Sequence, residues 1–406
     1  MISVFRNGPV FLGGGSILEN GMVIARDGKI VTVRDGNDAS IPDGAILFNL
    51  EGHMLFPGFI DCHVHLCSDG SPNPSEAVSR VSPPVLTLMI AEAARKTVMA
   101  GVTTIRDAGG KDHLELGVRD AIKNGLIPGP RILASGRLVC MTGGHGWQIG
   151  GREADGPDEV RKAVREQIKA GCDVVKLMAT GGVITEGVEP GSPQLTLEEL
   201  RAGVEAAHKA GRRAGIHAQG NEGIKNGLQA GIDILDHGVF LDQESIDMML
   251  EQGTFLIPTL SAPVNILREG DESLVPDFIL NKTRPIKEAH FKSIAMAREA
   301  GVAIGMGTDI GTPLNRHGEN LNELVYMAEL GFSPEEALIS ATSGAARALG
   351  ITEETGTIEE GKAADLVMVR GNPLEDIRLL ADPESIRVVV ADGTIVKTPN
   401  AGPCRF

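Results

Sequence analysis

Residues 57–65 read Pro-Gly-Phe-Ile-Asp-Cys-His-Val-His, a short apolar run that ends in two histidines. Such a run predicts a buried strand over residues 59–65. Because His63 and His65 are two residues apart, a strand would point both imidazoles to the same face, within reach of one metal ion. The alternative for an isolated His-x-His pair is two core histidines with satisfied hydrogen bonds.

Similar apolar runs recur along the chain and alternate with amphipathic stretches that predict helices. Several of these stretches, such as 158–170, 197–210 and 243–251, are followed by glycine, which suits the left-handed position after a helix. Alternating strands and helices favour parallel pairing, and eight such units predict an α/β fold of the (β/α)8 TIM-barrel type. An open doubly wound sheet is the structural alternative. The predicted strands are 59–65, 102–107, 131–138, 173–179, 213–218, 232–237, 254–259 and 302–309.

The two ends of the chain carry short β-like runs without long helices between them. Asp27-Gly28 and Asp392-Gly393 indicate hairpin turns, because Asp-Gly readily adopts positive φ angles. We therefore predict that residues 1–56 and 357–406 pair into one small β-sandwich domain beside a barrel domain over residues 57–356.

Composition excludes some classes of partner. The formal net charge of −16 argues against a nucleic-acid or anionic-membrane surface. No stretch approaches the roughly 18 apolar residues of a membrane span, and the first residues do not resemble a signal peptide. Five scattered cysteines favour reduced thiols, and a cytoplasmic location is expected. Cys62 and Cys67 could be zinc ligands, but no second closely spaced pair completes such a site.

Polar residues interrupt the apolar runs near the ends of several predicted strands. In a parallel barrel these strand ends converge on one mouth, so the residues should form a metal site there. An alternative role for the aspartate on the last strand is a cap for the next helix. The candidate metal ligands are His63, His65, Lys176, His217, His237 and Asp309.

Lys176 lies within an apolar run, where an unpaired ammonium group would be costly to bury. One interpretation is a lysine paired with a carboxylate. The other is that burial lowers its pKa, so that the neutral amine adds CO2 and the resulting carbamate bridges two metal ions. Arg106 and Asp107, on the second predicted strand, are expected to form a structural ion pair.

The motifs at these positions together resemble the amidohydrolase superfamily. They are PGFIDCHVH at 57–65, the strand-four Lys176, HAQ at His217, DHG at His237 and GTD at Asp309, and GKAADLV at 361–367 is similar to that superfamily's return to the β-sandwich. GVTTIRD at 101–107 and TGGHG at 142–146 resemble the imidazolonepropionase-related branch, which contains metal-dependent, prolidase-like dipeptidases and ochratoxinase-like amidases.

The resemblance implies a binuclear centre of two divalent ions, zinc being the expected metal. His63, His65 and Asp309 would hold one ion, His217 and His237 the other, and a carbamate on Lys176 would bridge them. Asp309 would be the catalytic residue that takes a proton from the attacking water and returns it to the leaving amine. The implied activity is hydrolysis of a small-molecule amide or dipeptide, by a dipeptidase (Xaa-Pro or similar) or an N-acyl amino acid amidase. A homo-oligomer is expected.

The residues that would bind the substrate are less well defined. Many dipeptide-cleaving relatives carry a ring two residues after the strand-five histidine, where this chain has Gln219. His145, in a glycine-rich loop, is a candidate for gripping a carbonyl or carboxylate, and the alternative is an ordinary loop histidine. We therefore predict Gln219 and His145 as substrate-binding residues.

Two other classes of function remain as alternatives. A mononuclear cyclic-amide hydrolase of the imidazolonepropionase type, or a deaminase, would not need Lys176. A deaminase usually places a glutamate soon after the strand-five histidine, and Glu222 has the wrong spacing. A non-catalytic assembly protein would be expected to lack some of the six ligands, all of which are present.

Overall fold

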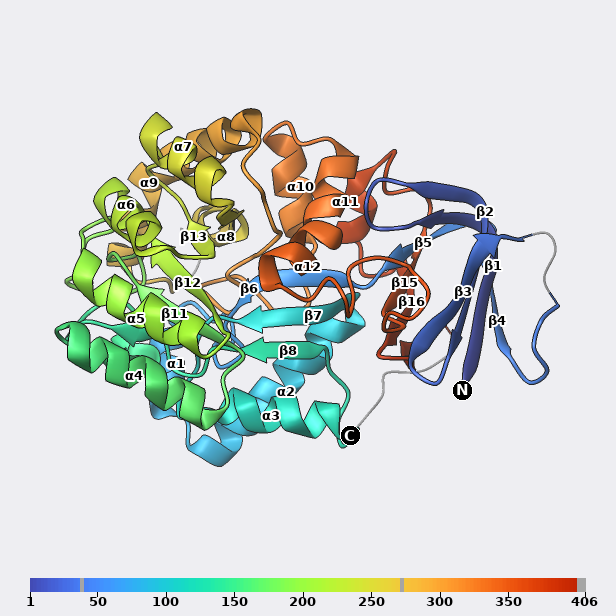
Figure 1. Cartoon of the computed structure of the whole chain (residues 1–406), viewed down its shortest axis with the longest axis horizontal. Helices are drawn as coiled ribbons and strands as arrows, with labels where there is room; N and C mark the ends of the chain where they lie inside the picture. The colour runs from blue at the N-terminus through green and yellow to red at the C-terminus, as the bar shows by residue number, and fades with distance from the viewer. Residues whose placement is uncertain (37–39, 271–273, 400–406) are drawn as a thin grey trace.

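The computed structural model describes residues 1–36, 40–270 and 274–399. Figure 1 shows two parts, a barrel wrapped in helices and a sheet built from both ends of the chain. Residues 400–406, which include Cys404, lie outside the described part. No helix of the described part has the length and hydropathy that crossing a membrane requires.

The barrel strands run parallel, and apart from β10, which pairs with β9, they follow the chain order around the barrel. Two ladders have the orders β6-β7-β8 and β10-β9-β11-β12-β13-β14. The Asp173 amide joins the two ladders by donating to the Ala134 carbonyl at 2.8 Å. The strands are β6 (Phe59–Val64), β7 (Val102–Asp107), β8 (Arg131–Ala134), β9 (Val139–Cys140), β10 (Arg152–Glu153), β11 (Val174–Met178), β12 (Arg213–Ala218), β13 (Ile234–His237) and β14 (Phe255–Ile257).

The second and fifth predicted strands agree with β7 and β12 residue for residue. Of the predicted strand 131–138, only residues 131–134 form a strand, β8, and β9 begins one residue after the predicted end. The prediction of a regular strand over 302–309 is wrong. This segment still closes the barrel through backbone hydrogen bonds. On one side the Leu256 amide donates to Ala303 at 2.9 Å, and on the other the Cys62 amide donates to Met306 at 2.8 Å. The open-sheet alternative is therefore excluded.

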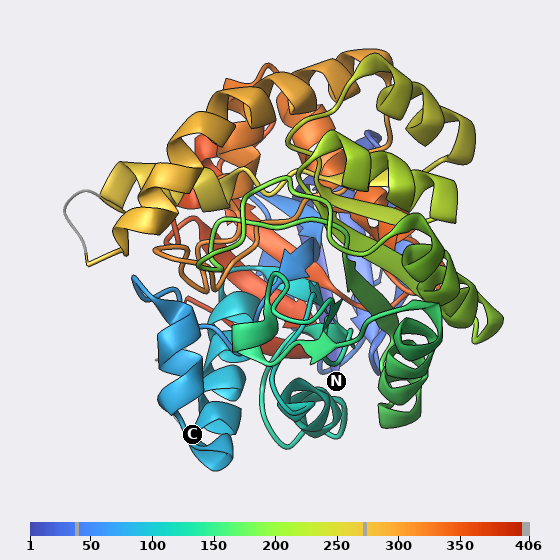
Figure 2. The same ribbon diagram turned by 90° about the vertical axis from the view of Figure 1, so that its left-hand side faces the viewer.

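The helices surround the barrel in chain order (Figure 2). Helix α4 shows why they pack there, since its buried Val160, Ala163, Val164 and Gln167 recur at helical spacing on one face. Gly171 follows α4 with φ of 100°, as predicted. The helices are α1 (Pro74–Arg80), α2 (Pro83–Met99), α3 (Leu114–Lys123), α4 (Pro157–Ala170), α5 (Leu197–Lys209), α6 (Asn221–Ala230), α7 (Gln243–Gln252), α8 (Ser261–Glu269), α9 (Asp277–Ala300), α10 (Asn322–Glu329), α11 (Pro334–Ser340) and α12 (Ser343–Leu349), with short 3-10 turns at Trp147–Ile149 and Ile377–Ala381.

The two chain ends form one eight-stranded sheet, which confirms the prediction that they pair with each other. Its order is β17-β16-β15-β5-β1-β2-β3, with β4 paired to β1. The junction between the ends is the antiparallel pair β5·β15, in which Leu55 faces Met368. The strands are β1 (Ile2–Phe11), β2 (Ile17–Arg26), β3 (Lys29–Asp35), β4 (Ile46–Asn49), β5 (His53–Pro57), β15 (Leu366–Arg370), β16 (Ile386–Ala391) and β17 (Thr394–Lys397).

Both predicted Asp-Gly turns close hairpins of this sheet. Asp27 and Gly28 have φ of 48° and 84°, and Asp392 and Gly393 have φ of 47° and 75°. In Figure 1 the arrowheads of β7 and β8 point away from the sheet. The sheet therefore lies at the opposite end of the barrel from the strand C-termini.

Because α9 contains a buried histidine, His290, we expect the free energy of unfolding to fall in acid. His290 donates from Nε2 to the His237 carbonyl at 3.0 Å, and burial lowers its pKa to about 4. Between pH 6.5 and 4 the unfolded chain therefore binds a proton that the folded chain excludes, and the free energy of unfolding should fall as the pH falls. For one proton the slope is about 1.4 kcal/mol per pH unit. Urea titrations across this window should show a shallower slope for His290→Gln than for the unmodified protein; equal slopes would contradict the account.

Candidate metal centre

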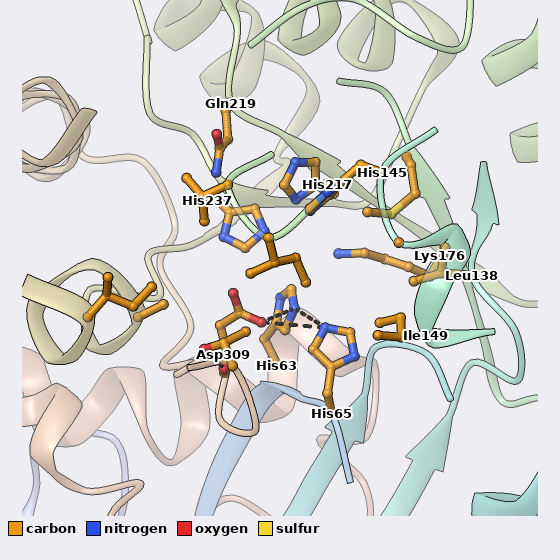
Figure 3. Close-up of a pocket in the computed structure, with 17 residues that line it drawn as sticks. His63, His65, Leu138, His145, Ile149, Lys176, His217, Gln219, His237 and Asp309 are labelled. Carbon is orange, nitrogen blue, oxygen red and sulfur yellow. Dashed lines mark hydrogen bonds and ion pairs between the residues drawn. The ribbon is translucent and has the colours of Figure 1, made fainter. Parts of the chain in front are cut away.

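Three predicted ligands converge at the mouth of the barrel. His63 lies in β6, His65 directly after it, and Asp309 in the closing segment. Asp309 Oδ1 lies 3.3 Å from His63 Nε2 and 3.4 Å from His65 Nε2, and the ligand atoms of all three residues lie within 4.8 Å of one another (Figure 3). Two imidazole nitrogens and a carboxylate oxygen form a donor set typical of zinc and related divalent ions.

The remaining two histidines extend this group across the mouth. His237, at the end of β13, has its ring centroid 5.1 Å from that of His63. His217 in β12 lies 4.5 Å from His237, again between centroids. Lys176 reaches toward the same space from β11 (Figure 3). The fold thus brings together all six residues that the sequence analysis proposed as ligands.

Hydrogen bonds fix the tautomers of three of these histidines. A carbonyl can only accept, so His65 carries its proton on Nδ1, which faces the Gly109 carbonyl at 2.9 Å. His217 carries its proton on Nε2, 3.1 Å from the Gly181 carbonyl. Thr259 donates its hydroxyl to Pro258 and so accepts from His237 Nδ1 at 2.7 Å. His65 Nε2, His217 Nδ1 and His237 Nε2 therefore keep free lone pairs, as metal ligands require.

Electrostatics favours the same protonation states. Burial lowers the pKa of His65 to about 4 and the pKa of His217 well below its ordinary value. Burial alone would raise the pKa of Asp309, but His63, His65 and Lys176 outweigh it and hold that pKa well below the usual range. At neutral pH, His65 and His217 are therefore neutral imidazoles and Asp309 is an ionised carboxylate.

A buried carboxylate beneath the histidines, Asp236, was missed by the sequence analysis. It accepts hydrogen bonds from Lys176 Nζ and from the Arg106 guanidinium, and its Oδ1 lies 3.1 Å from His63 Nδ1. The prediction that Arg106 pairs with Asp107 is wrong, because the Arg106 side chain reaches Asp236 on a distant strand instead. The position of Asp236 directly before His237 in the DHG motif was the available signal.

The Lys176–Asp236 pair agrees with the simpler interpretation of Lys176, a lysine paired with a carboxylate. Burial lowers the pKa of its ammonium group to about 8, although Asp236 opposes that shift. A neutral amine is therefore accessible near physiological pH. The carbamate interpretation stays a prediction.

A second buried carboxylate, Asp61, holds the first metal-binding strand against the closing segment. Its Oδ1 accepts from the His63 amide at 3.0 Å, and its Oδ2 accepts from the Thr308 hydroxyl at 2.7 Å and from Asn320 at 2.8 Å. The first bond holds the backbone of the predicted ligand His63, and the second holds Thr308, which directly precedes the predicted ligand Asp309. Asp61 therefore fixes the position of the HxH pair relative to Asp309.

The backbone is strained at two of the predicted ligands. His237 and Asp309 have φ of 73° and 57°, in the left-handed region that residues with a side chain seldom adopt. Such conformations cost on the order of 1–3 kcal/mol and persist only where the surroundings impose them. Gly307 lets the segment that carries Asp309 pass close to β6 and β14, because a Cβ there would lie 2.3 Å from Ile257 and 3.1 Å from the His63 backbone nitrogen.

Arg106 gives a stability prediction. It is fully buried, and replacing it with methionine would leave the Asp236 carboxylate with one cation fewer in the barrel interior. We expect Arg106→Met to lower the free energy of unfolding by about 3–5 kcal/mol. Arg152→Met, which removes the partly exposed pair with Glu166, should cost at most about 1 kcal/mol. Urea denaturation of both variants checks this, and equal losses would contradict the structural role of Arg106.

The cavity above the ligands contains both predicted substrate-binding residues. His145 packs against His217 with ring centroids 4.5 Å apart, and burial lowers its pKa to about 3. The Gln219 side chain extends toward His237 in Figure 3, and its Oε1 is buried with no hydrogen-bond partner among the described residues. The rest of the wall includes the apolar residues Leu138, Ile149, Met178, Val183, Ile184, Ala262 and Ile266.

Cys62, Cys67 and Glu222 take no part in this arrangement. Cys62 and Cys67 are free thiols that lie near the carbonyls of Ala345 and Gly109 rather than in the ligand group. Glu222 is exposed in the first turn of α6 and is not among the residues that line the cavity. The zinc-cysteine alternative and the deaminase alternative therefore gain no support from the geometry.

Comparison with known proteins agrees with this geometry. Residues 54–396 match the model of a family described as the amidohydrolase family. The ochratoxinase of Aspergillus niger is 31% identical over 99% of this chain and 88% of its own length. A solved Xaa-Pro dipeptidase with methionine bound in its active site has a TM-score of 0.90 and 32% identity, covering 98% of this chain and 100% of that chain. A prolidase complexed with N-methylphosphonate-L-proline has a TM-score of 0.91 and 31% identity, with the same coverage.

Proposed function

The chain belongs to the amidohydrolase family, and we propose that it cleaves the amide carbon–nitrogen bond of a dipeptide (Xaa-Pro or similar) or an N-acyl amino acid at a binuclear zinc centre. The observation that carries this proposal is the convergence of His63, His65 and Asp309 on one point, with the free lone pairs of His217 and His237 beside them. The resemblance to dipeptidases and to ochratoxinase supports the class of bond.

The donor set fits two divalent ions. His63, His65 and Asp309 would hold one, and His217 and His237 the other, with Lys176 between them as a carbamate. Ions bound there supply a Lewis acid for the scissile carbonyl and lower the pKa of water toward about 7. Two adjacent positions for divalent cations also explain why the chain buries four imidazoles, those of His63, His65, His217 and His237, in one place.

Asp309 is placed to move the proton. Its Oδ1 faces both histidines, and its other carboxylate oxygen turns toward the cavity in Figure 3. That oxygen can take the proton of the attacking water and return it to the leaving nitrogen. Much of the cavity wall is apolar, and an apolar surrounding strengthens these polar interactions.

The experiment is a screen of the purified, metal-loaded protein against dipeptides and N-acyl amino acids, with amine release as the readout. We expect hydrolysis of at least one group of these substrates, loss of activity with a chelator, and recovery with zinc or manganese. Ammonia release together with one ion per chain would favour the mononuclear alternatives instead. The homo-oligomeric state and the cytoplasmic location stay predictions.

A further inference from the structure

The loop between β11 and α5 forms part of the cavity wall. We call its residues 181–192 the β11 loop. Its two ends are joined, because the Gly181 amide donates to the Ser192 carbonyl at 2.8 Å. Two of its side chains, those of Val183 and Ile184, line the cavity. The β11 loop is therefore a closed segment of backbone that meets whatever binds above the metal ligands.

Thr185, in the middle of the β11 loop, orients the predicted substrate-binding residue His145. Its buried hydroxyl donates to Gln148 Oε1 at 3.2 Å. The same oxygen therefore accepts from His145 Nδ1 at 2.9 Å, and it also accepts from the Gly146 amide at 3.2 Å. The ring of His145 lines the cavity and keeps a lone pair on Nε2 (Figure 3). One hydroxyl thus fixes the tautomer of His145 and the backbone that follows it.

Lys282, in the second turn of α9, anchors the β11 loop. Its ammonium group donates to the Thr185 carbonyl at 2.8 Å and to the Val188 carbonyl at 2.5 Å. Phe278 lies against the same ammonium group, with its ring centroid 5.4 Å from Nζ. Lys282 is half-buried and is not among the residues that line the cavity. It therefore holds the loop from behind, at the residue whose hydroxyl meets His145.

We propose that Lys282 is a positioning residue for substrate binding, which acts through the β11 loop and Thr185 to hold His145 in the orientation that the substrate meets. This inference rests on the proposed function. The hydrogen bonds of Lys282 and of the Thr185 hydroxyl go to residues outside the metal-ligand group. Loss of Lys282 should therefore weaken substrate binding and leave the metal content unchanged.

Lys282→Met keeps the apolar part of the side chain and removes the ammonium group. We expect it to raise KM about tenfold, the equivalent of one lost hydrogen bond, with kcat and metal content within about twofold of the unmodified protein. Lys282→Arg, which can again donate to two carbonyls, should restore most of the lost affinity. Lys287→Met is the matched control and should leave KM unchanged, because Lys287 lies on the same helix with its Nζ 5.4 Å from the ring of Phe291.

A double-mutant cycle with Thr185→Val tests the route of the effect. Valine keeps the size of Thr185 but leaves His145 Nδ1 without its acceptor. If Lys282 acts through Thr185, the double variant should have a KM little above that of the worse single variant. Effects of Lys282→Met and Thr185→Val that multiply in KM would overturn the inference.

The single tryptophan of the chain gives a readout that needs no substrate. Trp147 is 47% exposed, and its two neighbours in the sequence both bond to the Thr185 hydroxyl. Lys282→Met should therefore increase the quenching of Trp147 fluorescence by acrylamide, and the control variant should not. Unchanged quenching or an unchanged KM in Lys282→Met would overturn the inference. If the unmodified protein cleaves no substrate, the proposed function fails, and the quenching measurement still decides whether Lys282 holds the loop.

Discussion

An Asp309→Asn variant is expected to lose about 10²- to 10⁴-fold in kcat while keeping its fold. The amide keeps the size of the carboxylate and an oxygen that can face His63 and His65, but it cannot take a proton at neutral pH. It also removes the negative charge that the neighbouring histidines stabilise. The loss should therefore exceed any change in KM.

Steady-state kinetics and metal analysis on the same preparation separate the two roles of Asp309. Asp69→Asn, which neutralises an exposed carboxylate close in sequence to the HxH pair, is the matched control and should retain nearly full activity. An Asp309→Asn protein with more than a tenth of the original kcat would contradict the assignment of Asp309 as the proton-transfer residue.

The second large effect is expected from Lys176→Ala, which should lower both metal content and activity, the latter by at least about 10²-fold. If a carbamate on Lys176 bridges the ions, alanine removes a ligand from each of them. The truncation also leaves Asp236 with Arg106 and His63 as its remaining partners.

The carbamate itself has a separate readout. Protein equilibrated with ¹³C-bicarbonate should show a carbamate carbon signal that Lys176→Ala lacks and that Lys209→Ala, a change at an exposed lysine, retains. Full activity and metal content in Lys176→Ala would exclude the bridging role and leave Lys176 as the cation that neutralises Asp236.

Much of the fold could be predicted because the signals are local. Apolar runs such as 102–107 and 213–218 identified β7 and β12, and the Asp-Gly pairs identified two hairpins. The irregular backbone of the closing segment, residues 302–309, could not be predicted from the sequence. Gly305 and Gly307 let it pass close to Ile257 and His63, and it makes bonds to both neighbours without a regular ladder.

The residues of the site also fall into those that could be predicted from the sequence and those that could not. Five of the ligands could be proposed because each lies at or near the end of a predicted strand, and parallel strand ends meet at one mouth. Lys176 could be proposed because it is a lysine inside an apolar run. The partner of Arg106 depends on which side chains meet inside the barrel, so the nearest carboxylate in the sequence, Asp107, was the wrong choice. Asp107 instead accepts the backbone amides of Leu66 and Gly109. Asp61 and Asp236 act through three-dimensional contacts, and the one local signal for Asp236 was its position directly before His237.

The most direct test of the account is elemental analysis of the purified protein, with activity followed through chelation and reloading. The account predicts close to two divalent ions per chain, loss of hydrolysis when they are removed, and its return when zinc or manganese is restored. A protein that binds no divalent ion, or that hydrolyses its substrate equally well after chelation, would contradict the central claim that His63, His65, His217, His237 and Asp309 form a catalytic metal centre.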